Sequence, residues 1–271
     1  MPETSLGGAI PIGTGELLLA TVFVLVAGGL SLRMGLRLER DLAMATARTY
    51  LQLIALGFVL RWVFVNQTWP IVLVLLGVMV VAAARVVLKR AGNAPPGVFG
   101  SSVLAMALTG FTITFTVTAL IIRVPVWYEA RYVLPIAGMV IGNSMTGIAL
   151  AVERLFADLD ARAAEMLGLT ALGATVWEAA QPSLRTALKA GLVPTISSMA
   201  AAGVVFIPGM MTGQVLAGAD PLDAARYQIV VMLMIAAATS VGAIASALLM
   251  YRRRFTADGV YLEQGYREPV S

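Results

Sequence analysis

The chain contains no cysteine and no histidine among its 271 residues. Disulfide frameworks, thiol chemistry, imidazole acid-base catalysis and zinc-finger spacings are therefore excluded. Charged residues are also scarce, at 13% of the chain against about 25% in soluble domains, whereas hydrophobic residues make up 59%. This composition predicts an all-α integral membrane protein, because a helix satisfies its own backbone hydrogen bonds in lipid.

Lysine is nearly absent, and this excludes one way of binding nucleotides. A Walker A loop needs a lysine between glycine and serine or threonine. The two lysines, Lys89 and Lys189, have no such neighbours. We therefore expect no cofactor in this chain, and any ATP that drives it must be bound by a partner.

Seven apolar runs are long enough to cross a bilayer, which takes about 20 helical residues. They occupy residues 17–32, 43–60, 69–88, 99–122, 133–152, 192–207 and 227–250. We predict one transmembrane domain over residues 1–271 with about seven membrane-spanning helices.

The basic residues predict the orientation of these spans. Placing the N-terminus outside and the C-terminus in the cytoplasm puts most of them in cytoplasmic segments, as the positive-inside rule requires. These residues are Arg33, Arg37, Arg40, Arg85, Lys89, Arg90, Arg154, Arg162, Arg185, Lys189, Arg252, Arg253, Arg254 and Arg267. The net charge of +4 is then explained by topology and by contact with lipid, so no nucleic-acid partner is expected.

The segment 153–189 interrupts the apolar sequence with an unusual density of charge, and the predicted orientation places it in the cytoplasm. Arg162 and Glu165 are three residues apart, where they can meet on one helix face. Thr175 and Glu178 have the spacing of a capping box, and Pro182 would kink or end the helix that follows. We predict a short helix, an elbow and another short helix, which would be either a solvated loop or a docking element.

The span 133–152 contains glycines and a central amide. Gly138 and Gly142 are four residues apart, which predicts close approach of another helix. Asn143 needs a partner at that depth, either another helix or a transported solute. With no cysteine or histidine, a metal could be held only by carboxylate, amide or hydroxyl oxygens and methionine sulfurs. The pathway candidates are Glu16, Met139, Asn143, Met145, Met210, Met211 and Gln214, although they form no recognisable ligand spacing. Residues 210–214 either form an extracellular loop or re-enter the outer leaflet.

Four motifs together resemble a known family. They are Pro135-Ile136-Ala137-Gly138-Met139 with Gly142-Asn143, Leu172-Gly173-Ala174-Thr175, Ile207-Pro208-Gly209-Met210-Met211-Thr212-Gly213, and Ala217-Gly218-Ala219-Asp220-Pro221 with Arg226-Tyr227-Gln228-Ile229. The chain resembles the bacterial iron-export ABC permeases, also known as an uncharacterised membrane family, from about the second span to the last.

The resemblance implies a permease of the bacterial inner membrane that exports iron or another metal ion. It implies a cytoplasmic ABC ATPase as partner, which hydrolyses the ATP, and a second copy of this chain. The elbow would contact the ATPase, with Glu165, Gly173, Thr175 and Arg185 at or near the contact. The alternatives are an ATP-independent secondary transporter or channel, and an ABC permease for a non-metal solute. A membrane enzyme is less well supported, because no set of catalytic groups is recognisable.

Overall fold

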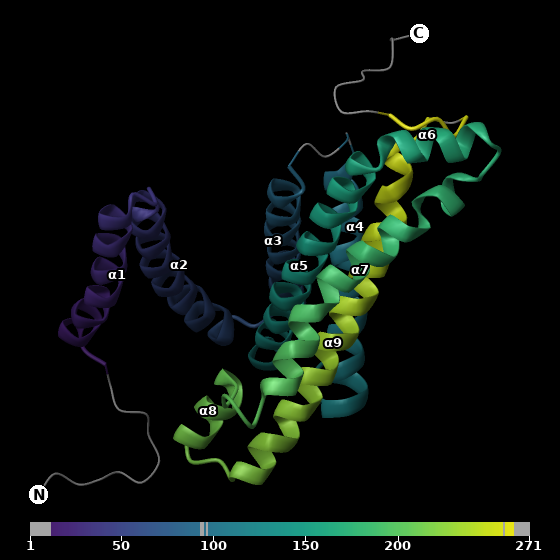
Figure 1. Cartoon of the computed structure of the whole chain (residues 1–271). Helices are drawn as coiled ribbons and strands as arrows, with labels where there is room; N and C mark the ends of the chain where they lie inside the picture. Colours follow the sequence, from purple (N-terminus) through teal and green to yellow (C-terminus); the bar gives the residue numbers. More distant parts are fainter. Residues whose placement is uncertain (1–11, 93–94, 96, 257, 263–271) are drawn as a thin grey trace, which may run out of the picture. The chain divides into compact units, whose positions relative to one another are not determined.

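A computed structural model describes residues 12–92, 95, 97–256 and 258–262 (Figure 1). Arg267, counted above among the cytoplasmic arginines, lies outside them. The regular elements of the described chain are helical, which confirms the predicted fold class. They are α1 (Thr14–Met34), α2 (Glu39–Val65), α3 (Trp69–Arg90), α4 (Val98–Thr116) with a π-helical end (Val117–Ile122), α5 (Ala130–Ala161), α6 (Ala163–Ala171), α7 (Val176–Ala201), α8 (Gly209–Leu216) and α9 (Pro221–Met250) with a 3₁₀ turn (Tyr251–Arg254).

The described residues divide into two compact units. The first contains α1 and α2 together with residues 213–219, and the second contains residues 68–212 and the chain from Asp220 onward. The prediction of one domain over residues 1–271 stays a prediction.

In the first unit, α1 and α2 form a helical hairpin whose turn is closed by local hydrogen bonds. Gly35 ends α1 in the left-handed conformation, at φ 67°, and its N–H bonds to the carbonyl of Leu32 at 3.2 Å. Ser31 Oγ accepts a bond from the Leu38 N–H at 3.1 Å and donates to a Glu39 carboxylate oxygen at 3.3 Å. These bonds fix the turn without a large core.

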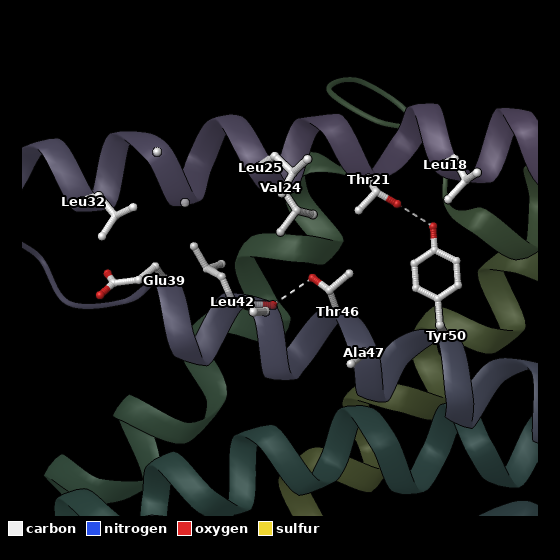
Figure 2. A pocket seen from close by; sticks show the side chains of 13 residues that line it. Leu18, Thr21, Val24, Leu25, Leu32, Glu39, Leu42, Thr46, Ala47 and Tyr50 are labelled. Atoms are coloured by element: carbon white, nitrogen blue, oxygen red, sulfur yellow. Dashed lines mark hydrogen bonds between the residues drawn. The ribbon is translucent and has the colours of Figure 1, made fainter.

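Further along the hairpin, the two helices enclose an apolar groove of about 700 Å³ (Figure 2). Gly28 and Gly29 leave it open because they have no side chains to fill it. The Tyr50 hydroxyl lies 2.8 Å from the Thr21 hydroxyl and donates to the Leu17 carbonyl at 2.7 Å, which ties α2 to α1. Most large apolar side chains of this hairpin are exposed, as expected for helices that face lipid or another protein surface.

In the second unit, α5 is the central helix and packs against α3, α4, α7 and α9. Apolar or small residues lie on several faces of α5, so 16 of its 32 residues are buried. Pro135 lies in its second turn and does not end it. The surrounding helices therefore take their positions from α5.

The helices α5 and α7 cross closely at two glycines. A Cβ atom added to Gly191 would lie 2.5 Å from the Gly147 carbonyl oxygen and 2.8 Å from the Ala151 Cβ. By contrast, nothing in the described chain lies within 4 Å of a Cβ added to Gly142, and Met79 is at 3.5 Å from one added to Gly138. The predicted close approach thus occurs one turn or more further along α5 than the sequence indicated.

Among the described residues, six helices have the length and apolar composition to cross a bilayer: α1, α2, α3, α4 with its π-helical end, α5, and α9 with its 3₁₀ turn. The expected span at residues 192–207 is not among these six, and its bounds differ from those of the helix observed there. Its first part is the end of α7, which stops at Ala201, and the chain then turns through Gly203 at φ 79°. The apolar part of α7 begins only after Arg185 and Lys189, so it is too short to count as a membrane span by length and composition.

Of the two alternatives for Pro182, the structure excludes the end of the helix, because α7 continues through it and through Pro194 as one helix of 26 residues. Pro182 removes one backbone hydrogen bond, but burial of one face offsets that loss. Ala180, Leu184, Ala187 and Gly191 follow helical spacing along this buried face. The second helix of the elbow is therefore long, and it carries the elbow into the body of the second unit.

Candidate functional site

The elbow between α6 and α7 has the capping box that the sequence predicted. Thr175 Oγ1 accepts a bond from the Glu178 N–H at 3.2 Å, and the Glu178 carboxylate accepts one from the Thr175 N–H at 2.8 Å. These bonds lower the pKa of Glu178, chiefly through the Thr175 N–H. Gly173 precedes the cap at φ 91°, a conformation that residues with a Cβ rarely adopt. The elbow is a defined turn rather than a slack loop.

Arg162 connects the three helices that meet at the elbow. Its Nε donates to Glu165 of α6 at 2.8 Å, and its Nη1 donates to Ser183 of α7 at 3.0 Å and lies 3.9 Å from Asp158 of α5. The hydrogen bond with Glu165 raises the pKa of Arg162 and lowers that of Glu165. The predicted Arg162–Glu165 contact is confirmed, and it forms part of a larger brace.

A second brace joins the elbow to the end of α9. Residues 251–256 and 258–262, here called the C-terminal clasp, fold back through a bridge between Phe255 and Tyr261. Arg254 donates to Asp160 at 3.0 Å, and the Tyr261 hydroxyl donates to the other carboxylate oxygen of Asp160 at 2.5 Å. The Trp177 ring of α7 also meets the Tyr251 ring edge-on at 5.9 Å. The clasp holds the start of α7, the end of α5 and the end of α9 together.

The solvent-facing surface of this elbow carries apolar side chains that the other described residues do not cover. Leu172 is 88% exposed at the turn, and Leu167 and Trp177 are exposed on the helices at either side. Single exposed apolar side chains are common on proteins, so Leu172 is a candidate contact because of its place at the turn between α6 and α7 rather than its exposure alone. Leu172 belongs to one of the four sequence motifs but was not predicted to be a contact residue. An apolar residue between Thr170 and Gly173, within a charged segment, was the signal that could have indicated it.

The four residues predicted to contact an ATPase are all exposed. Glu165 pairs with Arg162, and Gly173 and Thr175 form the turn itself. Arg185 is ten residues beyond Thr175 on α7, or about 15 Å along the helix axis. The structure thus groups Gly173 and Thr175 closely, whereas Arg185 would be reached only by a partner that covers the side of α7.

The other ends of α7 and α9 enclose a cavity of about 350 Å³. Figure 1 shows α7 and α9 side by side, with α6 near one end of the pair. The cavity lies toward the opposite end, where Met199 of α7, Met211 of α8 and Met232 of α9 contribute to its lining. Gln228 also lines it and is 7% exposed, and its Oε1 has no hydrogen-bond partner among the described residues.

Within the second unit, the structure does not bring the predicted pathway residues into one site. Met211 alone lines this cavity, while Met139 and Met210 pack against an apolar core cluster. Asn143 is exposed, and its amide donates to the Met139 carbonyl one turn back at 2.8 Å.

The remaining candidates are spread over both units. Glu16 is exposed in the first turn of α1, and Met145 is half-buried on α5. Gln214, on α8, is counted with the first unit. No group of three or more histidine, cysteine, aspartate or glutamate side chains that could hold a metal occurs in the described part of the chain. Sequence reasoning missed Met199, Gln228 and Met232, because their contact depends on packing between helices.

Comparison with known proteins assigns the chain to a family. The uncharacterised protein family UPF0014 matches residues 14–255. The UPF0014 membrane protein YjkA of Bacillus subtilis (strain 168) is 36% identical over 241 residues, which cover 89% of this chain and 95% of that protein. No solved structure matches the chain significantly.

Two further relatives have more descriptive names. The protein ALUMINUM SENSITIVE 3 of Arabidopsis thaliana is 36% identical over 241 residues, covering 88% of this chain and 85% of that protein. The probable iron export permease protein FetB of Escherichia coli (strain K12) is 33% identical over 238 residues, covering 88% of this chain and 90% of that protein. The family match spans nearly the whole chain, and six of its helices are apolar enough to cross a membrane. The chain therefore belongs to the UPF0014 family of multi-pass membrane proteins.

Proposed function

We propose that this chain is the transmembrane subunit of an ABC exporter in a bacterial inner membrane. It would pair with a second copy of itself and with a separate cytoplasmic ATPase, and would export iron or another metal ion. The name of the Escherichia coli relative supports export of a metal. The chain's own lack of a Walker A lysine requires that a partner supply the ATPase.

The observation that carries this proposal is the braced elbow with Leu172 exposed at its turn. A surface that receives force from a motor must be firmly tied to the parts that it moves. Arg162 ties this elbow to α5 and α7, and the Asp160 contacts tie it to the end of α9. Leu172 would insert into an apolar pocket of the ATPase, in the way that buried apolar anchors dominate other interfaces.

The same helices offer a mechanical route to the opposite end of the second unit. α7 has 26 residues and α9 has 30, so they span about 39 and 45 Å. When ATP binding closes the ATPase dimer, the elbow would shift, and α7 and α9 would carry the shift to the cavity. The partner drives this change only if it binds the two conformations with different affinity.

Substitution of the exposed leucine tests the docking surface. Leu172→Asp should weaken association with the ATPase about 30-fold, which corresponds to the roughly 2 kcal/mol of an interface hot spot. Leu222→Asp is the matched control, because Leu222 is 70% exposed in the first turn of α9, far along the helix from the clasp. Co-purification of each variant with a cytoplasmic ABC ATPase of the same organism measures the effect. Equal association of both variants with the ATPase would remove the elbow from the interface.

Transport separates the proposal from its alternatives. Proteoliposomes with both subunits should move ferrous ion or another metal only when ATP is present on the elbow side. Movement without ATP or ATPase would instead support the channel or secondary transporter. If the subunits associate and hydrolyse ATP but no metal moves, the ABC permease for a non-metal solute becomes the better assignment.

A further inference from the structure

The cavity at the end of α7 and α9 is lined by methionines from three separate elements, and methionine sulfur is a soft metal ligand. Met199, Met211 and Met232 come from α7, α8 and α9, so a bound species would be surrounded by thioethers from three sides. All three residues are half-buried. Because methionine has three rotatable side-chain bonds and a polarisable sulfur, these side chains can adapt their positions to a bound ligand.

Gln228 adds an oxygen to this set. It lies four residues before Met232, so both project from the same face of α9. Its Oε1 is shielded from solvent and has no hydrogen-bond partner among the described residues. An unpaired buried acceptor destabilises the fold, and a ligand that contacts it would remove that penalty.

The chemistry of the lining distinguishes between classes of ligand. The ten residues that line the cavity include no charged side chain. Thioether sulfur favours soft ions such as Cu(I), whereas harder divalent ions favour carboxylate, imidazole or water. Burial of a divalent ion without a compensating carboxylate would also carry a large desolvation cost. The lining thus fits a soft monovalent cation better than ferrous ion.

We infer that the cavity formed by Met199, Met211, Met232 and Gln228 binds a soft monovalent cation of the Cu(I) type. This inference rests on the proposed function only for the idea that the bound cation is transported. Binding itself needs neither ATP nor the ATPase, so it is tested on the permease alone. The ATPase association described above is an independent measurement, and either can fail without the other.

The test is a titration of the purified full-length chain with Cu(I) in anaerobic detergent solution against a chromogenic Cu(I) chelator. The wild type should bind one equivalent. The triple variant Met199→Leu, Met211→Leu, Met232→Leu keeps the size of the side chains and removes the sulfurs. Loss of a residue that only hydrogen-bonds to a metal ligand weakens metal binding about 10–100-fold. Loss of the ligands themselves should therefore weaken Cu(I) binding by about 100-fold or more.

Matched controls keep the number of leucine substitutions the same. The variant Met139→Leu, Met145→Leu, Met210→Leu changes half-buried methionines outside the cavity lining and should bind as the wild type does. Gln228→Leu should weaken binding, whereas Gln228→Glu, which keeps an oxygen at the same position, should retain it. Copper X-ray absorption of the wild type should show sulfur neighbours, a result that does not depend on the folding of any variant.

Three results would overturn the inference. Equal Cu(I) affinity of the two triple variants would show that the bound ion is elsewhere. A copper spectrum with oxygen or nitrogen neighbours only would exclude the thioethers. Ferrous ion that displaces Cu(I) from the wild type at similar concentration would exclude the preference for soft ions.

Discussion

The two ends of the second unit differ in how their polar groups are satisfied. At the elbow, Arg162, Asp160 and Glu178 each engage in defined hydrogen bonds between or within helices. At the cavity, the Gln228 Oε1 has no partner among the described residues, and the neighbouring methionines are flexible. An element that transmits force gains from fixed contacts, whereas a site that must bind and release a ligand gains from groups that remain unpaired until the ligand arrives. The contrast supports a mechanical role for one end and a binding role for the other.

The largest expected effect comes from breaking the brace at Asp160. Asp160→Ala leaves the guanidinium of Arg254, whose side chain is 7% exposed, without this carboxylate. Loss of one member of a largely buried pair should reduce the free energy of unfolding by about 3 kcal/mol. Thermal unfolding in detergent measures the loss. Cu(I) binding at the far cavity should remain, because the substitution acts on the elbow end alone.

Asp258→Ala is the control for this change, because Asp258 belongs to the same clasp but is exposed. It should alter the free energy of unfolding by no more than about 0.5 kcal/mol. If the two variants unfolded at the same temperature, the clasp would not be a brace.

A smaller effect is expected between the two ends, where α7 crosses α5. Gly191→Ala places a Cβ 2.5 Å from the Gly147 carbonyl oxygen, so the helices must separate. Overpacking of this kind should cost about 2 kcal/mol of unfolding free energy. It should also reduce ATP-driven transport more than ATPase association, because the link between the ends is altered and the docking surface is not.

Gly142→Ala provides the comparison on α5, since the described chain leaves open space around that glycine. The substitution should leave transport unchanged and stabilise the helix slightly, because alanine has the higher helix propensity. A transport defect in Gly142→Ala equal to that of Gly191→Ala would mean that the crossing point has no special role.

The smallest expected effect is the pH dependence of the stability that the capping box contributes. Hydrogen bonds lower the pKa of Glu178 in the folded chain below its ordinary value of 4.5. The stabilisation is therefore complete above about pH 4.5 and is lost as the pH falls through the folded pKa. The difference in unfolding temperature between wild type and Glu178→Gln should be constant above about pH 4.5 and should shrink as the pH falls below that value. A difference that stays constant or grows below that pH would show that the carboxylate has another role.

Features that depend on residues close in sequence could be predicted. The Arg162–Glu165 pair and the Thr175–Glu178 cap each involve a separation of three residues, so helix geometry alone brings them together. Pro182, by contrast, does not end its helix, although its local effect alone would allow that. Its local effect is to break a helix, but burial of one side of α7 against its neighbours outweighed that preference.

The candidate site was predictable only in part. Met211 was predicted from its motif. Met199 lies on α7, and Gln228 and Met232 lie on α9, so their place beside Met211 depends on helix packing. Gly142 was expected at the helix crossing because of its spacing from Gly138. The spacing allows close approach but does not say which turn of α5 will meet α7, and the structure places that contact at Gly147.

By itself, the sequence determined that this is a helical membrane protein with a capped elbow, since composition and short-range spacing suffice for these features. The tertiary structure decided how the elbow is held and where a ligand could bind. Arg254 and Tyr261 reach Asp160 across 94 and 101 residues of chain, and the cavity needs three helical elements. Such contacts depend on how whole helices pack, because each helix offers several apolar faces and its sequence does not specify which partner will cover each one.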